Sequence, residues 1–94
     1  ERRPLRCPPR AWCGCWLGIR VGMPDRKLWL ARNWAHVGRP AKPGPGVIVV
    51  WRSHVGKIIR MTGPGRAVVL SGNDGNAVRE RERSIRNAIA FRDV

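Results

Sequence analysis

The sequence predicts an α+β domain in which N-terminal helices pack on an antiparallel β-meander. Three observations predict this class. Apolar residues recur at helical spacing from Ala11 onward, β-branched runs replace them after Gly46, and turn residues separate those runs at short intervals. The 94 residues suffice for one domain with one core.

Residues 1–10 are basic and proline-rich and are predicted to form an arm, and residues 11–94 to form a single domain. The first helix is expected over residues 11–21 and ends before Gly22 and Pro24. Five apolar side chains of this segment share one helical face: Ala11, Trp12, Cys15, Trp16 and Ile19.

A second helix is expected over residues 27–37, with Asp25 as its N-cap. Leu30, Trp34 and Val37 would share its buried face. Gly38 and Pro40 end this helix, and residues 39–46 are predicted to be a turn-rich connector.

Four strands are expected after Gly46, each bounded by glycine, serine or asparagine turns. Their predicted ranges are 47–52, 54–61, 66–71 and 77–83. The residues from Ser84 onward fit either a last strand or a short helix.

The chain carries 19 Lys and Arg against six Asp and Glu, a formal net charge of +13 at pH 7. Such a charge predicts non-specific binding to polyanions, namely nucleic acid, anionic cell-wall polymer or a lipid surface. The alternative is that arginines simply cover solvated faces. No apolar run is long enough for a membrane span. The chain begins at Glu1, so earlier removal of a leader or an upstream domain stays open.

The three cysteines receive different predictions. Cys13 and Cys15 are too close for a relaxed disulfide, and Cys7 in the arm is expected to have no role. Cys15 shares a face with Ala11 and Ile19 and is expected in the core. Cys13 lies where the first helix begins, where the helix dipole would lower the pKa of its thiol and favour a nucleophile. A zinc site from these cysteines fits no standard spacing, so no metal or cofactor is expected.

Two further residues complete a candidate catalytic set. His54 opens the second strand, and Asn73 follows the third strand. Adjacent antiparallel strands bring such ends together, so the sequence suggests a Cys–His–Asn constellation. His36, the other histidine, is expected at the surface.

Five segments in order resemble the papain-like cell-wall hydrolases of the NlpC and CHAP type. They are "AWCGCWL", "LWLARNWAHVGRPAKPGPGVIVVWR", "SHVGKI", "VVLSGNDGNAV" and "AIAFR", and together they span about residues 11–92. The resemblance implies a papain-like core and cleavage of peptide or amide bonds in peptidoglycan. It implies that Cys13 is the nucleophile, His54 the general base and Asn73 the orienting residue. It would also place the protein in the periplasm or outside the cell.

The chain departs from the family's motifs at identifiable positions. Ser53 replaces a glycine before the histidine, and Gly46-Val47 replaces a Gly-Asp pair. Asp74 is an alternative orienting residue. Trp12, expected at the rim of a groove, is predicted together with Ser53 and Asp74 to contact substrate.

The competing hypothesis is a non-enzymatic basic module that binds nucleic acid or another polyanion. The net charge, the basic arm and the segment "VRERERSIR" favour it. Against it, the alternating acids of "RERER" suit cross-strand pairing, and the chain has no recognisable nucleic-acid-binding motif.

Overall fold

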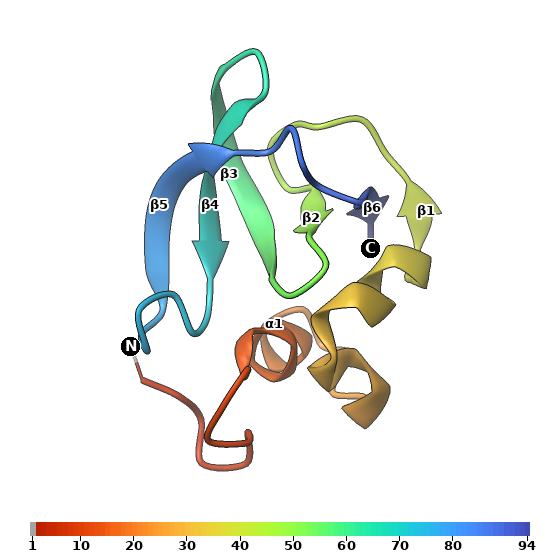
Figure 1. Cartoon of the computed structure of the whole chain (residues 1–94). Helices are drawn as coiled ribbons and strands as arrows, with labels where there is room; N and C mark the ends of the chain where they lie inside the picture. The colour runs from red at the N-terminus through yellow and green to blue at the C-terminus, as the bar shows by residue number, and fades with distance from the viewer. Residues whose placement is uncertain (1) are drawn as a thin grey trace.

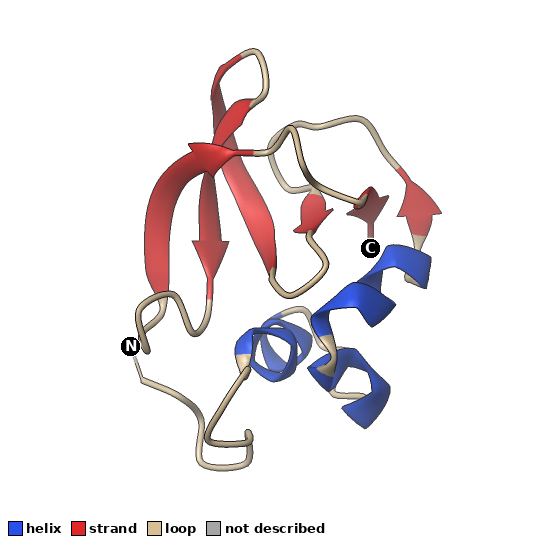
Figure 2. Ribbon diagram, viewed as in Figure 1, coloured by secondary structure: helices blue, strands red, loops and turns tan. Residues whose placement is uncertain are grey.

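The protein is a small α+β domain, seen in a computed structural model that describes residues 2–94. Six antiparallel strands form one sheet, and the helices lie together on one side of it (Figures 1 and 2). This confirms the predicted fold class at the level of an α+β domain with an antiparallel sheet.

The helical part consists of the α-helix α1 (Cys13–Arg20) and two 3₁₀ helices, η1 (Arg26–Trp29) and η2 (Ala31–His36). The helix expected over residues 11–21 is therefore present in shortened form. The expected second α-helix is wrong, because Leu30 adopts an extended conformation that separates η1 from η2. The side chain of Asp25 does cap η1, since it accepts a hydrogen bond from the Lys27 N–H at 2.9 Å.

The sheet has the order β1-β6-β2-β3-β4-β5. Its central part is the predicted meander, made of β2 (Ile48–Val50), β3 (Val55–Gly63), β4 (Arg66–Ser71) and β5 (Arg79–Ser84). The two remaining strands are β1 (Arg39–Pro40), which lies in the predicted connector, and β6 (Ala90–Asp93). The ambiguous C-terminal segment thus contains a strand, which returns to pair with β2 and β1.

Apolar residues pack against both faces of the sheet. The larger cluster fills the space between helices and sheet, where Trp34 is fully buried and donates its indole N–H to the Leu28 carbonyl at 2.8 Å. The smaller cluster lies on the opposite face, and its buried members are Val49, Trp51, Ile58, Ala67, Val69 and Ile85. All residues from Cys13 to Gly18 are buried, so α1 has no solvated face over most of its length.

A disulfide joins Cys7 to Cys15 and fastens the N-terminal arm to α1. The expectation that Cys7 has no role is wrong, because its side chain is buried in the larger cluster. Within the arm, Arg3 donates to the Cys7 carbonyl at 2.7 Å. The bridge also excludes the alternative zinc site, since two of its three thiols are oxidised.

No helix within residues 2–94 has the length and apolarity needed to cross a bilayer.

Candidate active site

Cys13 is the first residue of α1, and its thiol is the free one among the cysteines. The backbone N–H groups of Cys13, Gly14 and Val55 all act on its sulfur as hydrogen-bond donors. The residue is only 2% exposed, yet it lines a pocket of about 340 Å³ with Leu30, Arg52 and Ser53. A thiol in this position is accessible to a ligand only through that pocket.

Burial raises the pKa of the Cys13 thiol above its ordinary value, and the three N–H groups offset this only in part. The expectation that the helix start lowers this pKa is therefore wrong. Desolvation of the thiolate outweighs the donors at the first turn of α1 because the whole turn is buried. At neutral pH Cys13 is a thiol that needs a base to become a nucleophile.

His54 lies at the end of the hairpin turn that joins β2 to β3. The turn is closed by a hydrogen bond from the Trp51 N–H to the His54 carbonyl at 2.8 Å. The ring atom Nε2 is 2.9 Å from the Ser71 hydroxyl oxygen, and Ser71 is only 1% exposed at the end of β4. Ser71 therefore fixes the ring through Nε2 and leaves Nδ1 as the second nitrogen.

The pKa of His54 is lowered to about 4. Burial is the main cause and the positive charge of Arg83 adds to it, whereas the negative charge of Asp74 acts in the opposite direction. The imidazole is consequently neutral at pH 7, and with this pKa it is a weaker base than a free histidine.

The lowered pKa of His54 predicts that acid destabilises the protein. Between about pH 6.5 and pH 4 the unfolded chain binds a proton at His54 that the folded chain does not, so the free energy of unfolding falls as pH falls. We expect a loss of about 2–3 kcal/mol over this window. Urea denaturation at pH 7, 5.5 and 4 measures it.

The control for this pH dependence is His54→Gln, which removes the titrating group. Glu82 also has a lowered pKa, chiefly because Arg66 donates a hydrogen bond to it, so acid weakens that pair in both proteins. The difference between the two proteins in how the free energy of unfolding depends on pH gives the contribution of His54. Equal slopes in wild type and His54→Gln would contradict a buried neutral ring.

The other residues predicted for the site lie in different surroundings. Asn73 is half-buried in the turn after β4, in a left-handed conformation with φ 54°, which asparagine tolerates. The hydrogen bond recorded for the His54 ring goes to Ser71 and not to Asn73. Asp74 is 7% exposed and forms an ion pair with Arg81 at 3.1 Å.

The prediction that Trp12 lies at the rim of a groove is wrong, whereas Ser53 does line pockets. Trp12 is 2% exposed and lies in the core, so it does not rim a groove. Its ring packs close to Gly72, where a Cβ atom would come within 2.9 Å of it. Ser53 is exposed and lines both the pocket at Cys13 and a second pocket at His54.

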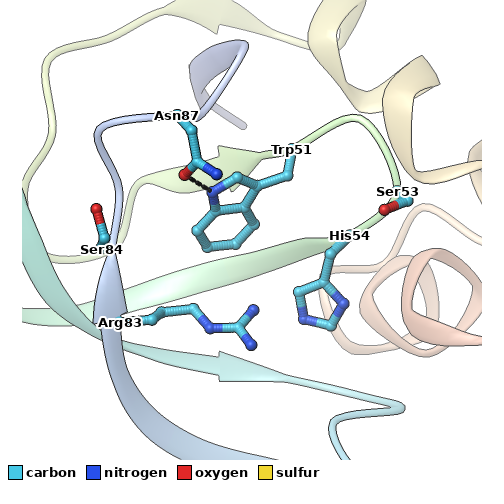
Figure 3. Close-up of a pocket in the computed structure, with 6 residues that line it drawn as sticks. All are labelled: Trp51, Ser53, His54, Arg83, Ser84 and Asn87. Carbon is cyan, nitrogen blue, oxygen red and sulfur yellow. Dashed lines mark hydrogen bonds between the residues drawn. The ribbon is translucent and has the colours of Figure 1, made fainter.

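The second pocket has a volume of about 350 Å³ and is lined by Trp51, Ser53, His54, Arg83, Ser84 and Asn87 (Figure 3). The ring centroids of Trp51 and His54 are 5.8 Å apart. Sequence reasoning missed Ser71, Trp51, Arg83 and Asn87 as site residues. Strand alternation offered a signal for two of them. Ser71 lies on the same face of β4 as Ala67 and Val69, and Arg83 of β5 pairs with Ala67 and so shares that face.

The structure places the thiol and the imidazole in two separate pockets. Cys13 Sγ accepts from the N–H of Val55, the residue next to His54 in the chain, and Ser53 is common to both pockets. Cys13 does not line the pocket at His54, and His54 does not line the pocket at Cys13, so the structure links the two residues through Ser53 and the Val55 N–H. No protein-family model, curated protein or solved structure matches this chain.

Proposed function

We propose that the protein is a cysteine-dependent hydrolase that cleaves peptide or amide bonds of peptidoglycan. The observation that carries the proposal is the position of Cys13. It begins α1, accepts from the Val55 N–H, and lines a pocket that has Ser53 in common with the neighbouring pocket of the neutral, hydrogen-bonded His54. The resemblance of the chain's motifs to NlpC- and CHAP-type hydrolases supplies the substrate class.

In the proposed reaction, Cys13 Sγ attacks the carbonyl carbon while its proton passes to His54 Nδ1. The backbone N–H groups around the sulfur are suited to hold the developing oxyanion. His54 then gives the proton to the leaving amine as the C–N bond breaks, which leaves a thioester on Cys13. Water attacks the thioester with His54 again as base, and this step releases the carboxylic acid and restores the thiol.

The resting states of the two groups exclude a preformed thiolate–imidazolium ion pair. A raised pKa for Cys13 and a pKa of about 4 for His54 keep both groups neutral in the resting protein. The thiolate therefore forms only as substrate reacts.

The test is digestion of purified peptidoglycan and soluble muropeptides, followed by mass spectrometry of the products. We expect the masses of the two cleavage products to add up to the mass of the parent compound plus one water. We also expect loss of activity when iodoacetamide alkylates Cys13. Peptide mapping identifies the modified cysteine. Absence of cleavage on all peptidoglycan fragments by the folded, disulfide-bonded protein would refute the proposal.

The second candidate function, binding to an anionic polymer, is favoured by uncompensated positive charge. Among residues 2–94 two ion pairs are recorded, Arg66–Glu82 and Arg81–Asp74, whereas the chain has 19 Lys and Arg. Binding of this kind weakens steeply with salt and shows little sequence preference. It would persist in a Cys13→Ala protein, which separates it from catalysis.

A further inference from the structure

The pocket beside His54 is lined entirely by groups that can donate hydrogen bonds or present an apolar face. None of its six lining residues is acidic. Figure 3 shows the Arg83 guanidinium extending beneath the Trp51 ring toward His54, with Asn87 at the indole N–H edge of that ring. A pocket with these walls has an excess of donors over acceptors and is suited to an anionic group.

Arg83 supplies the positive charge of this pocket. Its guanidinium carbon lies 5.1 Å from the centroid of the Trp51 ring, so the indole supports one face of the group. Neither of the two ion pairs recorded within residues 2–94 involves Arg83. The charge of Arg83 reaches His54, because it contributes to the lowered pKa of that ring.

One neutral donor, the Asn87 amide, accompanies Arg83. The Trp51 indole N–H donates to Asn87 Oδ1 at 3.1 Å, which holds the indole in place and leaves the Asn87 amide NH₂ available to the pocket (Figure 3). The Ser84 side chain points away from Arg83, and its oxygen accepts from the Arg86 N–H at 3.3 Å.

We propose that this pocket binds a carboxylate of the substrate, held by the Arg83 guanidinium with the Asn87 amide as a further donor. A carboxylate matches the planar fork of one arginine with two parallel hydrogen bonds. That the ligand is a substrate rests on the proposed hydrolase function. The preferred substrates would then be peptides with a free carboxylate close to the scissile bond.

The test is NMR titration of the full-length Cys13→Ala protein with N-acetylglutamate and with its neutral diamide. Cys13→Ala prevents turnover and leaves the pocket at Arg83 unchanged. We expect N-acetylglutamate to shift the Trp51 indole signal saturably and to raise the pKa of His54, since a carboxylate offsets the field of Arg83. The diamide should bind about 10-fold more weakly or not at all.

Arg83→Gln should weaken N-acetylglutamate binding by about 10-fold or more, and Arg83→Lys should have an intermediate effect. The matched control is Arg60→Gln, which removes the same charge from exposed β3 outside the pocket. If Arg83→Gln does not fold, the relative affinities of the Cys13→Ala protein for N-acetylglutamate and for the diamide still test the carboxylate site.

Failure of this proposal and failure of the hydrolase proposal give different results. Arg83-dependent binding without any hydrolysis by the wild-type protein would support the carboxylate site and refute the hydrolase. Equal binding of N-acetylglutamate and its diamide, or equal effects of Arg83→Gln and Arg60→Gln, would overturn the carboxylate site even if peptidoglycan is cleaved. Binding of inorganic phosphate as tightly as N-acetylglutamate would also overturn it, in favour of a general anion site.

Discussion

Replacing Cys13 with alanine is expected to abolish peptidoglycan hydrolysis, with a loss of about 10³-fold or more in kcat. The sulfur is the atom that would form the thioester, and no other free thiol is present within residues 2–94 to replace it. The fold should survive because alanine fills most of the same small buried site, at a cost of about 1 kcal/mol. Mass spectrometry of muropeptide products measures the activity, and circular dichroism monitors the fold.

The partners of Cys13 should show a graded effect in the same assay. His54→Ala should lose about as much activity as Cys13→Ala, because the thiol is left without a base. Ser71→Ala should lose about 10-fold, because the serine hydroxyl positions Nε2 at 2.9 Å and does not react.

Asn73→Ala is the control for the orienting residue, and we expect a smaller loss from it than from Ser71→Ala. If Asn73→Ala is as inactive as His54→Ala while Ser71→Ala is fully active, then Asn73 orients the ring. Full activity of Cys13→Ala would refute the whole catalytic assignment.

Local signals in the sequence were enough to predict the start of α1 and the β2–β3–β4–β5 meander. Pro8-Pro9 upstream and Gly22 downstream bracket α1, and glycine-rich turns separate the strands. The position of Cys13 at a helix start and of His54 at a strand start followed from these signals. The helix from 27 to 37 did not form because Leu30, expected on its buried face, is 47% exposed and extended. Tertiary packing overrides helical periodicity there.

Features that depend on distant parts of the chain were not predictable in this way. β6 pairs with β2, which lies about 40 residues earlier, and no local sequence pattern indicates this pairing. The hydrogen-bond partner of the His54 ring lies two positions before the predicted one, because the end of β4 places the Ser71 hydroxyl on the ring and the following turn carries Asn73. The pKa of Cys13 depends on how deeply α1 is buried, which the helix dipole alone does not determine.

The disulfide between Cys7 and Cys15 was also missed, because pairing partners cannot be read from cysteine spacing alone. The position of this disulfide connects it to the candidate site. Cys15 belongs to the same first turn of α1 as Cys13, and Cys7 belongs to the arm. The bridge therefore anchors the helical turn that carries Cys13, the proposed nucleophile, although neither bridged cysteine takes part in the proposed chemistry.

Removing this disulfide is expected to lower the free energy of unfolding by about 2–3 kcal/mol, from the loop-closure entropy for a separation of eight residues. For a domain of this size the corresponding fall in melting temperature is about 10–20 °C. The double variant Cys7→Ala/Cys15→Ala, which leaves no unpaired buried thiol, measures the effect by thermal and urea unfolding.

The matched comparison uses a reductant. Dithiothreitol should destabilise the wild-type and Cys13→Ala proteins equally and have no effect on the double variant, because only the Cys7–Cys15 bridge responds. Peptidoglycan hydrolysis should fall in the double variant at temperatures where its melting transition begins and persist well below them, since Cys13 and His54 remain. A double variant that is as stable as wild type would show that packing of the arm, and not the covalent bond, holds α1 in place.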